Sequence, residues 1–244
     1  MFIFNLLRAE GSISDKIIVA LAFVLVATFS IVIHEVAHGF VAKLNGDLTA
    51  KDRGRLTLNP VAHLDPIGVA MMLLVGFGWA KPVPINPNNF TNRKKGIFTV
   101  SIAGISANII IAGLCLLLYF LLYPVIIKTL YAVGTNAIVS VLLNFLYSLL
   151  VLGVQINLLL AFFNLLPIYP LDGFNVLNTF LPYGNAYQRV MVRYGSFILI
   201  GLILIGNVGN MFGIRWLNIF SLFGDLIEML LDKVTLESLK VFLL

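Results

Sequence analysis

The sequence predicts an all-α polytopic membrane protein with four to five transmembrane helices. Hydrophobic residues make up 60% of its 244 residues and charged residues only 11%. A soluble domain is roughly half apolar and about a quarter charged. Several apolar runs also reach the roughly 20 residues that a spanning helix needs. We therefore expect a single membrane-embedded domain over residues 1–244, in contact with the lipid bilayer.

Four segments are long and apolar enough to span a membrane. They are Ile17–Leu44, Gly96–Tyr123, Ala137–Leu166 and Tyr194–Phe212. A fifth segment, Leu217–Leu231, is shorter and contains Asp225 and Glu228. It either spans the membrane or lies along its surface, and the two acidic residues favour the surface.

The segment Pro66–Pro84 lies between the first two spans and is apolar but rich in glycine and proline. It is too short for an ordinary spanning helix. Non-helical backbone at membrane depth requires protein or trapped water to satisfy its polar groups. We therefore expect a re-entrant loop or a β-hairpin that dips into the protein, with a plain surface loop as the alternative.

Basic residues predict the orientation of the chain in the plasma (inner) membrane. The segment between the first two spans carries Lys43, Lys51, Arg53, Arg55, Lys81, Arg93, Lys94 and Lys95. The turns after the second and third spans carry far fewer basic residues. Short loops rich in Lys and Arg stay in the cytoplasm, so this loop should be cytoplasmic and the N-terminus outside. The net charge of +5 belongs to this pattern, and we expect no nucleic-acid binding.

The end of the first span, IVIHEVAHGF, places His34, Glu35 and His38 at membrane depth. Ionisable residues inside spans are rare and are usually functional. Four-residue spacing on a helix puts both imidazoles on one face. An H-E-x-x-H sequence on a helix can hold one zinc ion, with the glutamate as general base. The alternative is a pair of histidines packed in a polar bundle near the membrane surface.

A catalytic zinc takes three protein ligands and keeps one position open. Asp172 is the best third candidate, because it follows the third span in NLLPIYPLDGF. Successive spans alternate in direction, so the ends of the first and third spans lie on the same side of the membrane. His34, His38 and Asp172 can therefore converge there. The same aspartate could instead cap a helix or form a turn, which Asp-Gly also favours.

These residues, with GWAKPVPIN at 78–86, A-G-x-x-A-N at 103–108 and NLLPIYPLDG at 164–173, resemble the site-2 proteases. The resemblance covers roughly residues 20–180 and is to the short prokaryotic members without a PDZ or CBS domain. That family consists of intramembrane zinc metalloproteases that cut membrane-spanning proteins. The resemblance therefore implies regulated intramembrane proteolysis by a catalytic core at about residues 17–180, with one Zn²⁺ per chain.

The resemblance also implies a role for each matching residue. His34, His38 and Asp172 would be the zinc ligands, and Glu35 would be the catalytic acid and base. Asn108 would steady the substrate backbone or the oxyanion. A substrate helix must unwind to expose its scissile carbonyl, and we expect it to add a strand to the edge of the 66–84 hairpin.

Three further residues are candidates for supporting roles. Asn164 and Pro167 would shape the broken end of the third span. His63 could orient a metal ligand, but we prefer the simpler interpretation that it shapes a cytoplasmic turn before Pro66.

The sequence departs from the family pattern at three positions. Ile105 follows Gly104 where the family usually has proline, Tyr169 stands where proline is frequent, and Phe174 where a second glycine is frequent. None of these changes removes a proposed ligand or the base. They concern the substrate groove and leave the chemistry unaffected.

Two other functions fit parts of the sequence. A transporter or metal carrier would line its pathway with polar residues in the spans, such as Asn108, Gln155, Asn157 and Asn164. A carrier does not need a glutamate between paired histidines, however, and an inactive scaffold would not need every catalytic position filled. We therefore favour the metalloprotease. The sequence leaves the identity of the substrate and the oligomeric state open.

Overall fold

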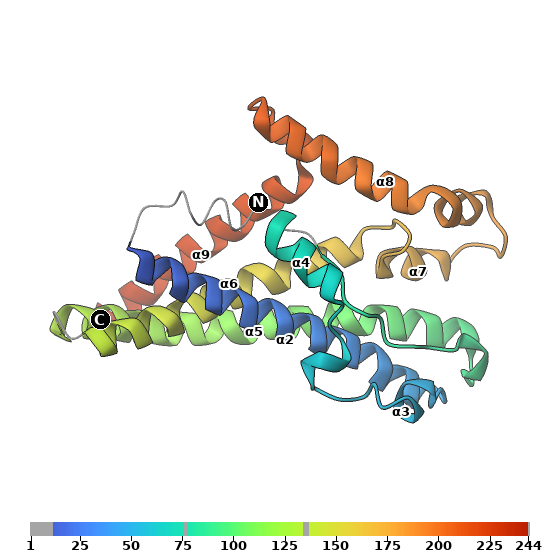
Figure 1. The fold of residues 1–244 in the computed structure, drawn as a ribbon, viewed down its shortest axis with the longest axis horizontal. Helices are drawn as coiled ribbons and strands as arrows, with labels where there is room; N and C mark the ends of the chain where they lie inside the picture. Colours follow the sequence, from blue (N-terminus) through green and yellow to red (C-terminus); the bar gives the residue numbers. More distant parts are fainter. Residues whose placement is uncertain (1–11, 76–77, 134–136, 244) are drawn as a thin grey trace.

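The computed structural model describes residues 12–75, 78–133 and 137–243, and helices dominate it (Figure 1). Within the described residues, four helices are long and apolar enough to cross a membrane. They are α2 (Ile13–Leu44), α5 (Arg93–Val133), α6 (Ala137–Leu165) and α8 (Ala186–Met211). The protein is therefore an all-α, multi-pass membrane protein, as the sequence predicted.

Three spans, α2, α5 and α8, begin earlier than their apolar runs suggest, because capping residues decide where a helix starts. At the start of α2, the Ser12 side chain accepts a hydrogen bond from the Asp15 N–H while the Asp15 carboxylate accepts from the Ser12 N–H. This reciprocal pair satisfies two free donors of the first turn. Single side-chain caps precede the other two: Asn185 accepts from the Gln188 N–H at the start of α8, and Asn92 accepts from the Lys95 N–H at the start of α5.

Helices α2, α5 and α6 pack together, and Figure 1 shows α5 running in the opposite direction to the other two. Small residues allow the close approach, as is usual between spanning helices. At Gly153 of α6, an added Cβ would lie 2.6 Å from the Cys115 sulfur of α5. The parallel course of α2 and α6 brings their C-terminal ends to the same end of the bundle.

The segment 66–84, for which we expected a re-entrant loop or a β-hairpin, forms no hairpin in its described residues. It forms a short helix, α4 (Pro66–Val75), and then extended chain that includes residues 78–86. The described residues contain no β-strand, and the isolated antiparallel bridge between Leu64 and Ala80 is all that remains of the pairing. Prolines 82, 84 and 87 explain this, because a proline has no N–H to donate to a ladder. The depth of this segment in the membrane stays a prediction.

The predicted fifth segment is part of a longer helix, α9 (Ile219–Leu243). Although α9 is not among the candidate spans, it packs on α5 and α6. Ile227 and Leu231 are buried there, and the Thr235 hydroxyl lies 2.6 Å from the Tyr119 hydroxyl of α5. This segment is therefore a helix packed against the bundle, and its placement across the membrane or along its surface stays a prediction.

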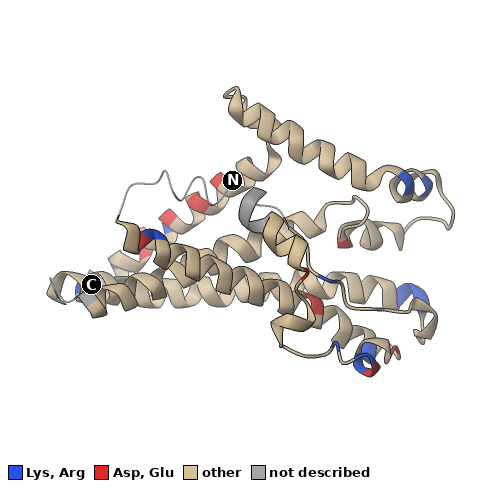
Figure 2. Ribbon diagram, in the orientation of Figure 1, with Lys and Arg blue, Asp and Glu red and all other residues tan. Residues whose placement is uncertain are grey.

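The remaining elements are short and lie near the ends of the spans. They are α3 (Thr49–Asp52), η1 (Pro60–Ala62), η2 (Pro87–Asn89), α7 (Asp172–Asn178) and η3 (Arg215–Leu217). Figure 2 shows basic residues gathered where α2 ends and α5 begins, and at the start of α8. This is the end of the bundle that the sequence predicts to be cytoplasmic.

Candidate metal centre

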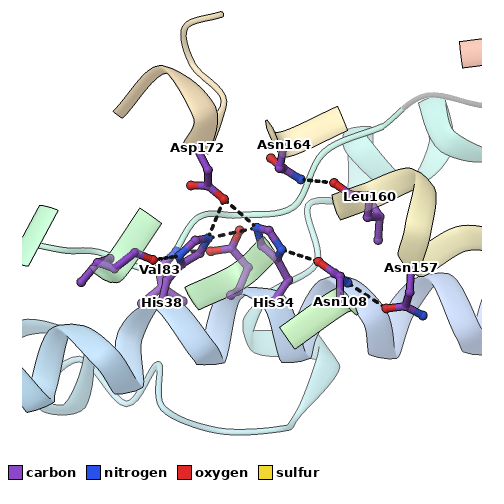
Figure 3. Close-up of polar contacts among 10 residues, drawn as sticks. His34, His38, Val83, Asn108, Asn157, Leu160, Asn164 and Asp172 are labelled. Carbon is purple, nitrogen blue, oxygen red and sulfur yellow. Dashed lines mark hydrogen bonds and ion pairs between the residues drawn. The ribbon is translucent and has the colours of Figure 1, made fainter. Parts of the chain in front are cut away.

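His34 and His38 lie one turn apart on α2, and Asp172 is the first residue of α7 (Figure 3). The Nε2 atoms of the two histidines are 3.0 Å apart. The Asp172 Oδ2 atom lies 3.3 Å from the Nε2 of His34 and 3.2 Å from that of His38. The structure thus brings together the three residues that the sequence predicted as ligands, as a group able to hold a metal ion.

Gly173 allows the chain to turn back so that Asp172 reaches the histidines. A Cβ at position 173 would collide with the backbone carbonyl groups of Leu165 and Leu166 at the end of α6. Only glycine therefore fits directly after Asp172, which gives the Asp-Gly pair a packing role beyond an ordinary turn.

The partner of each Nδ1 atom decides which histidine nitrogen is free to bind a metal. The Nδ1 atom of His38 lies 2.7 Å from the backbone carbonyl oxygen of Val100. A carbonyl oxygen can only accept a hydrogen bond, so Nδ1 carries the proton and Nε2 presents a lone pair.

His34 is fixed in the same state through two buried amide side chains (Figure 3). The Asn157 Nδ2 donates to the Gly153 carbonyl oxygen at 2.8 Å, which sets the orientation of that amide. Its Oδ1 accepts from the Asn108 Nδ2 at 2.8 Å, and the Asn108 Oδ1 then faces the His34 Nδ1 at 2.6 Å. The Nδ1 of His34 is therefore the donor, and its Nε2 also presents a lone pair.

Three electron-rich atoms consequently face one another. The Asp172 Oδ2 atom is buried and meets no hydrogen-bond donor among the described residues. Such atoms repel one another unless a cation lies among them. Two imidazoles and a carboxylate suit a catalytic zinc, and tetrahedral ligands about 2.1 Å from one zinc lie about 3.4 Å apart. The three residues therefore fit a zinc ion.

Gly104 of α5 permits the close packing against both imidazoles. An added Cβ would lie 2.5 Å from the His34 Cε1 atom and 2.6 Å from the Nε2 atoms of His34 and His38. The rings cannot move aside without breaking their Nδ1 hydrogen bonds. A side chain at position 104 would therefore displace the two proposed metal ligands.

Glu35 lies beside the ligands and lines the same cleft, which has a volume of about 370 Å³. Its Oε2 atom accepts a 2.8 Å hydrogen bond from the Val83 backbone N–H. Val83 belongs to the extended chain after α4, which forms one wall of the cleft with Pro82 and Ile85. A backbone donor from a distant segment thus holds the glutamate in place.

The charge of Asp172 follows from its neighbours. Without a metal, a proton on either Nε2 atom would supply the donor that Asp172 lacks. In that state burial raises the pKa of the Asp172 carboxyl group, but the imidazoles of His34 and His38 outweigh this and keep the pKa below its usual value. Asp172 is therefore a carboxylate at neutral pH, which is the form that binds a metal.

Asn108 lies beside the proposed ligand His34 but behind it, away from the cleft. It is fully buried; its Oδ1 atom bonds the His34 Nδ1, and its Nδ2 donates to the Asn157 Oδ1. It does not line the cleft. The structure shows its contact with the proposed ligand His34, and a contact with substrate or oxyanion stays a prediction.

His63 lies outside the metal group. It is fully buried, and its Nε2 lies 2.8 Å from the Thr57 carbonyl oxygen. Its own carbonyl oxygen accepts a 2.8 Å hydrogen bond from the Lys81 N–H. These contacts tie the loop before α4 to the extended chain, which agrees with a turn-shaping role.

Asn164 and Pro167 lie where α6 ends, as expected. The Asn164 Nδ2 donates to the Leu160 carbonyl oxygen at 3.0 Å, and its side chain lines the cleft. The Pro167 carbonyl oxygen accepts from the Tyr187 hydroxyl of α8. This contact links the end of α6 to the start of α8.

Sequence reasoning missed three contributors to the site. Asn157 is visible in the sequence only as a polar residue in a span, although a buried amide there must find a partner. Gly104 has the signature of a close helix contact but does not reveal its neighbour. Val83 contributes through its backbone, so no side-chain pattern could have identified it.

Two curated proteins are similar to this chain. The Bacillus subtilis (strain 168) protein named "Putative zinc metalloprotease YwhC" is 36% identical over 190 residues, which cover 78% of this chain and 82% of that protein. The Mycolicibacterium smegmatis (strain ATCC 700084 / mc(2)155) protein named "Putative zinc metalloprotease Rip2" is 30% identical over 193 residues, covering 77% and 66%. No protein-family model and no solved structure matches the chain.

Proposed function

The chain belongs to the site-2 protease-like family of these zinc metalloproteases, and we propose that it cuts membrane-anchored proteins within or near their transmembrane segments. The observation that carries this proposal is the location of the site. Its two histidines and its glutamate lie on α2, a helix long and apolar enough to span the membrane. A protease with its catalytic residues there meets peptide bonds at or near membrane depth.

His34, His38 and Asp172 would hold the zinc ion through the Nε2 and Oδ2 atoms that face one another. When bound, zinc lowers the pKa of a water molecule toward about 7 and polarises the scissile carbonyl. Val100 and Asn108 keep the two imidazoles in the tautomer that leaves these nitrogens free. The geometry of the ligands is thus set before the metal arrives.

Glu35 would act as the general base and then as the general acid. Its carboxylate takes a proton from the attacking water and later delivers that proton to the leaving amine. The Val83 N–H occupies its Oε2 atom, which aims the carboxylate along the wall of the cleft. The remaining oxygen, Oε1, is then the atom that handles the proton.

The substrate would lie along the extended chain that forms this wall. Because the described residues of this segment form no hairpin edge, we propose that the substrate pairs with single backbone groups of residues 82–86 and not with a full ladder. Prolines 82 and 84 can accept hydrogen bonds but not donate them. An unwound substrate would therefore supply most of the donors.

The rival function, a transporter or metal carrier, receives less support from the polar residues in the spans. Asn108 and Asn157 are fully buried and bonded to each other, so they do not line a pathway. These two residues serve the ligand geometry instead.

A membrane-spanning test protein, reconstituted with the wild type or with Glu35→Gln, tests the proposal. Loss of the base should lower the rate roughly 10²- to 10⁴-fold while zinc content stays unchanged. Chelation of zinc should stop cleavage by the wild type. Cleavage that survives both treatments would refute the protease function, and transport without cleavage would establish the carrier.

We also propose that the protein lies in the plasma membrane with its N-terminus outside and the metal centre toward the cytoplasm. Thr57 lies in the basic loop that should then be cytoplasmic. Thr57→Cys, in a protein whose Cys115 is replaced, should react with a membrane-impermeant thiol reagent only after the cells are opened. Labelling in intact cells would reverse the orientation.

A further inference from the structure

The extended chain at residues 78–86 determines where the Val83 N–H meets Glu35, so whatever holds this chain also determines how the glutamate is aimed. Near its start, the chain is held by the Lys81 N–H, which donates to the His63 carbonyl oxygen. The Arg55 guanidinium also donates to the Lys81 carbonyl oxygen at 2.7 Å. The far end is held by a buried carboxylate, that of Asp47.

Asp47 lies in the turn after α2 and is fully buried. Its Oδ2 atom accepts from the Asn86 backbone N–H at 2.7 Å. Its Oδ1 atom accepts from the Asn89 Nδ2 at 2.8 Å, from the Thr49 N–H at 3.1 Å and from the Thr49 hydroxyl. Every one of these donors is neutral, and both oxygens are used.

The long-range bonds distinguish Asp47 from an ordinary turn aspartate. An aspartate that only shapes a turn needs donors one to three residues away, as Thr49 provides. Asn86 and Asn89 are 39 and 42 residues further along the chain. The Thr91 N–H adds a 2.9 Å bond to the Asn45 carbonyl oxygen. The turn after α2 is thus clamped to the end of the extended chain.

We propose that Asp47 is a positioning residue that sets the register of the extended chain against Glu35. Asn86, which Asp47 holds, comes three residues after Val83, which bonds Glu35. Proline 84 lies between them and fixes its own φ angle, so this stretch has few ways to absorb a displacement. A shift at Asn86 therefore moves the Val83 N–H. The effect on catalysis rests on the proposed protease function; the anchoring does not.

Asp47→Asn in the full-length protein tests this, because asparagine keeps the shape but replaces one accepting oxygen with a donor. Amide exchange at Val83 and Asn86 should become at least about tenfold faster, while exchange in α6 stays the same. A displacement of about 1 Å can cost about 10²-fold in rate, so kcat should fall about 10- to 100-fold. Zinc content should not change, since Asp47 touches no ligand.

Asn218→Ala is the matched control, because Asn218 is also buried and its Oδ1 accepts backbone N–H groups at the start of α9. That variant should lose stability but keep kcat per zinc-loaded molecule. If Asp47→Asn behaves like this control, the positioning role is refuted.

Asn89→Ala provides a second test should Asp47→Asn fail to fold. It removes one donor to Asp47 and should speed exchange at Asn86 by a smaller factor. Unchanged exchange in both variants overturns the proposal, whether or not the wild type cleaves a substrate. Faster exchange together with a wild type that cuts nothing would support the anchor and refute only the protease function.

Discussion

Asp47 and Asp172 are two aspartates beside the C-terminal half of α2, and they differ in what surrounds their oxygens. The Asp47 carboxylate accepts four hydrogen bonds, all from neutral groups of the protein. The Asp172 Oδ2 atom is buried and faces two imidazole nitrogens that present lone pairs. The protein satisfies the first carboxylate, and the second is left facing a position where a zinc ion fits.

This difference separates a carboxylate that anchors the chain from one that can bind a metal. A buried charge is costly unless hydrogen bonds or an opposite charge offset the loss of water. At Asp47 the donors come from the chain, so the bonds stabilise the fold. At Asp172 the deficit is left for a ligand, and an unsatisfied buried group of this kind marks a functional site.

Exchanging each carboxylate for an amide gives the largest expected contrast. Asp172→Asn should lower zinc affinity by more than the roughly 10- to 100-fold typical of residues that only support a ligand, and cleavage should stop. Its metal-free form should unfold at the same temperature as the wild type or higher, because an unsatisfied charge is removed. Asp47→Asn should keep its zinc. Metal analysis and thermal unfolding of both variants measure this. Equal zinc loss in the two variants would contradict the assignment of metal binding to Asp172 and not to Asp47.

Two glycines on α5 test how small a displacement of the His34 and His38 imidazoles abolishes metal binding. Gly104→Ala should push the imidazoles apart and lower activity about 10²-fold, with a corresponding loss of zinc. Gly113→Ala is the control on the same helix, since an added Cβ there meets nothing within 4 Å. It should be neutral or stabilising by about 0.4–1 kcal/mol. Normal zinc binding by Gly104→Ala would show that the rings can move.

The buried amides of Asn108 and Asn157 support the proposed ligand His34 from outside the cleft. Asn157→Leu leaves the Asn108 amide free to rotate, so His34 loses the partner that fixes its tautomer. We expect about 10- to 100-fold weaker zinc binding. Titration with a competing chelator measures the affinity, and Ser148→Ala, at another buried polar position of α6, should leave it unchanged. An unaltered zinc affinity in Asn157→Leu would show that Asn157 and Asn108 do not contribute to metal binding.

Acid unfolding tests the Asp47 side, with the smallest expected effect. Burial raises the pKa of this carboxyl, but hydrogen bonds from Thr49, Asn86 and Asn89 outweigh it and lower the pKa below its usual value. The carboxylate therefore stabilises the fold above the unfolded-state pKa of about 3.9, and this contribution is lost as the pH falls through the lower folded-state pKa. Hydrogen bonds to a charged group contribute about 1.5–3 kcal/mol.

The measurement compares unfolding free energies of the wild type and Asp47→Asn between neutral pH and about pH 3. The difference between them should be greatest at neutral pH and shrink as the pH falls. A difference that stays constant over this range would mean that the charge of Asp47 contributes nothing.

Local patterns in the sequence were sufficient to predict the spans and to select the three proposed ligands. Apolar length located four spanning helices, and the structure contains four candidates in its described residues. The spacing of His34 and His38 placed both on one helix face, and alternating spans brought Asp172 to the same end. These inferences need only helix periodicity and the direction of each span. They therefore do not depend on how side chains pack.

The surroundings of the ligands depended on the tertiary structure. Asn108 carries an amide that could face a substrate or a histidine, and the sequence does not distinguish the two. The choice is made by Asn157, whose own amide bonds reach Ser30, 127 residues away, and the Gly153 carbonyl. Hydrogen bonds over such distances in the chain leave no periodic signal.

The region after α2 shows the same limit. The sequence predicted a re-entrant loop or a β-hairpin at 66–84. Prolines 82 and 84 cannot donate to a ladder, and the described residues form an extended chain in place of a hairpin. The sequence also presents Asp47 only as a charge in a basic loop. Composition and periodicity thus determined which helices form and which residues could bind metal. The packing of segments about 40 residues apart or more decided that donors of the protein satisfy Asp47, whereas Asp172 is left able to bind an ion. The physical reason is that the role of a carboxylate depends on the donors that folding brings to it.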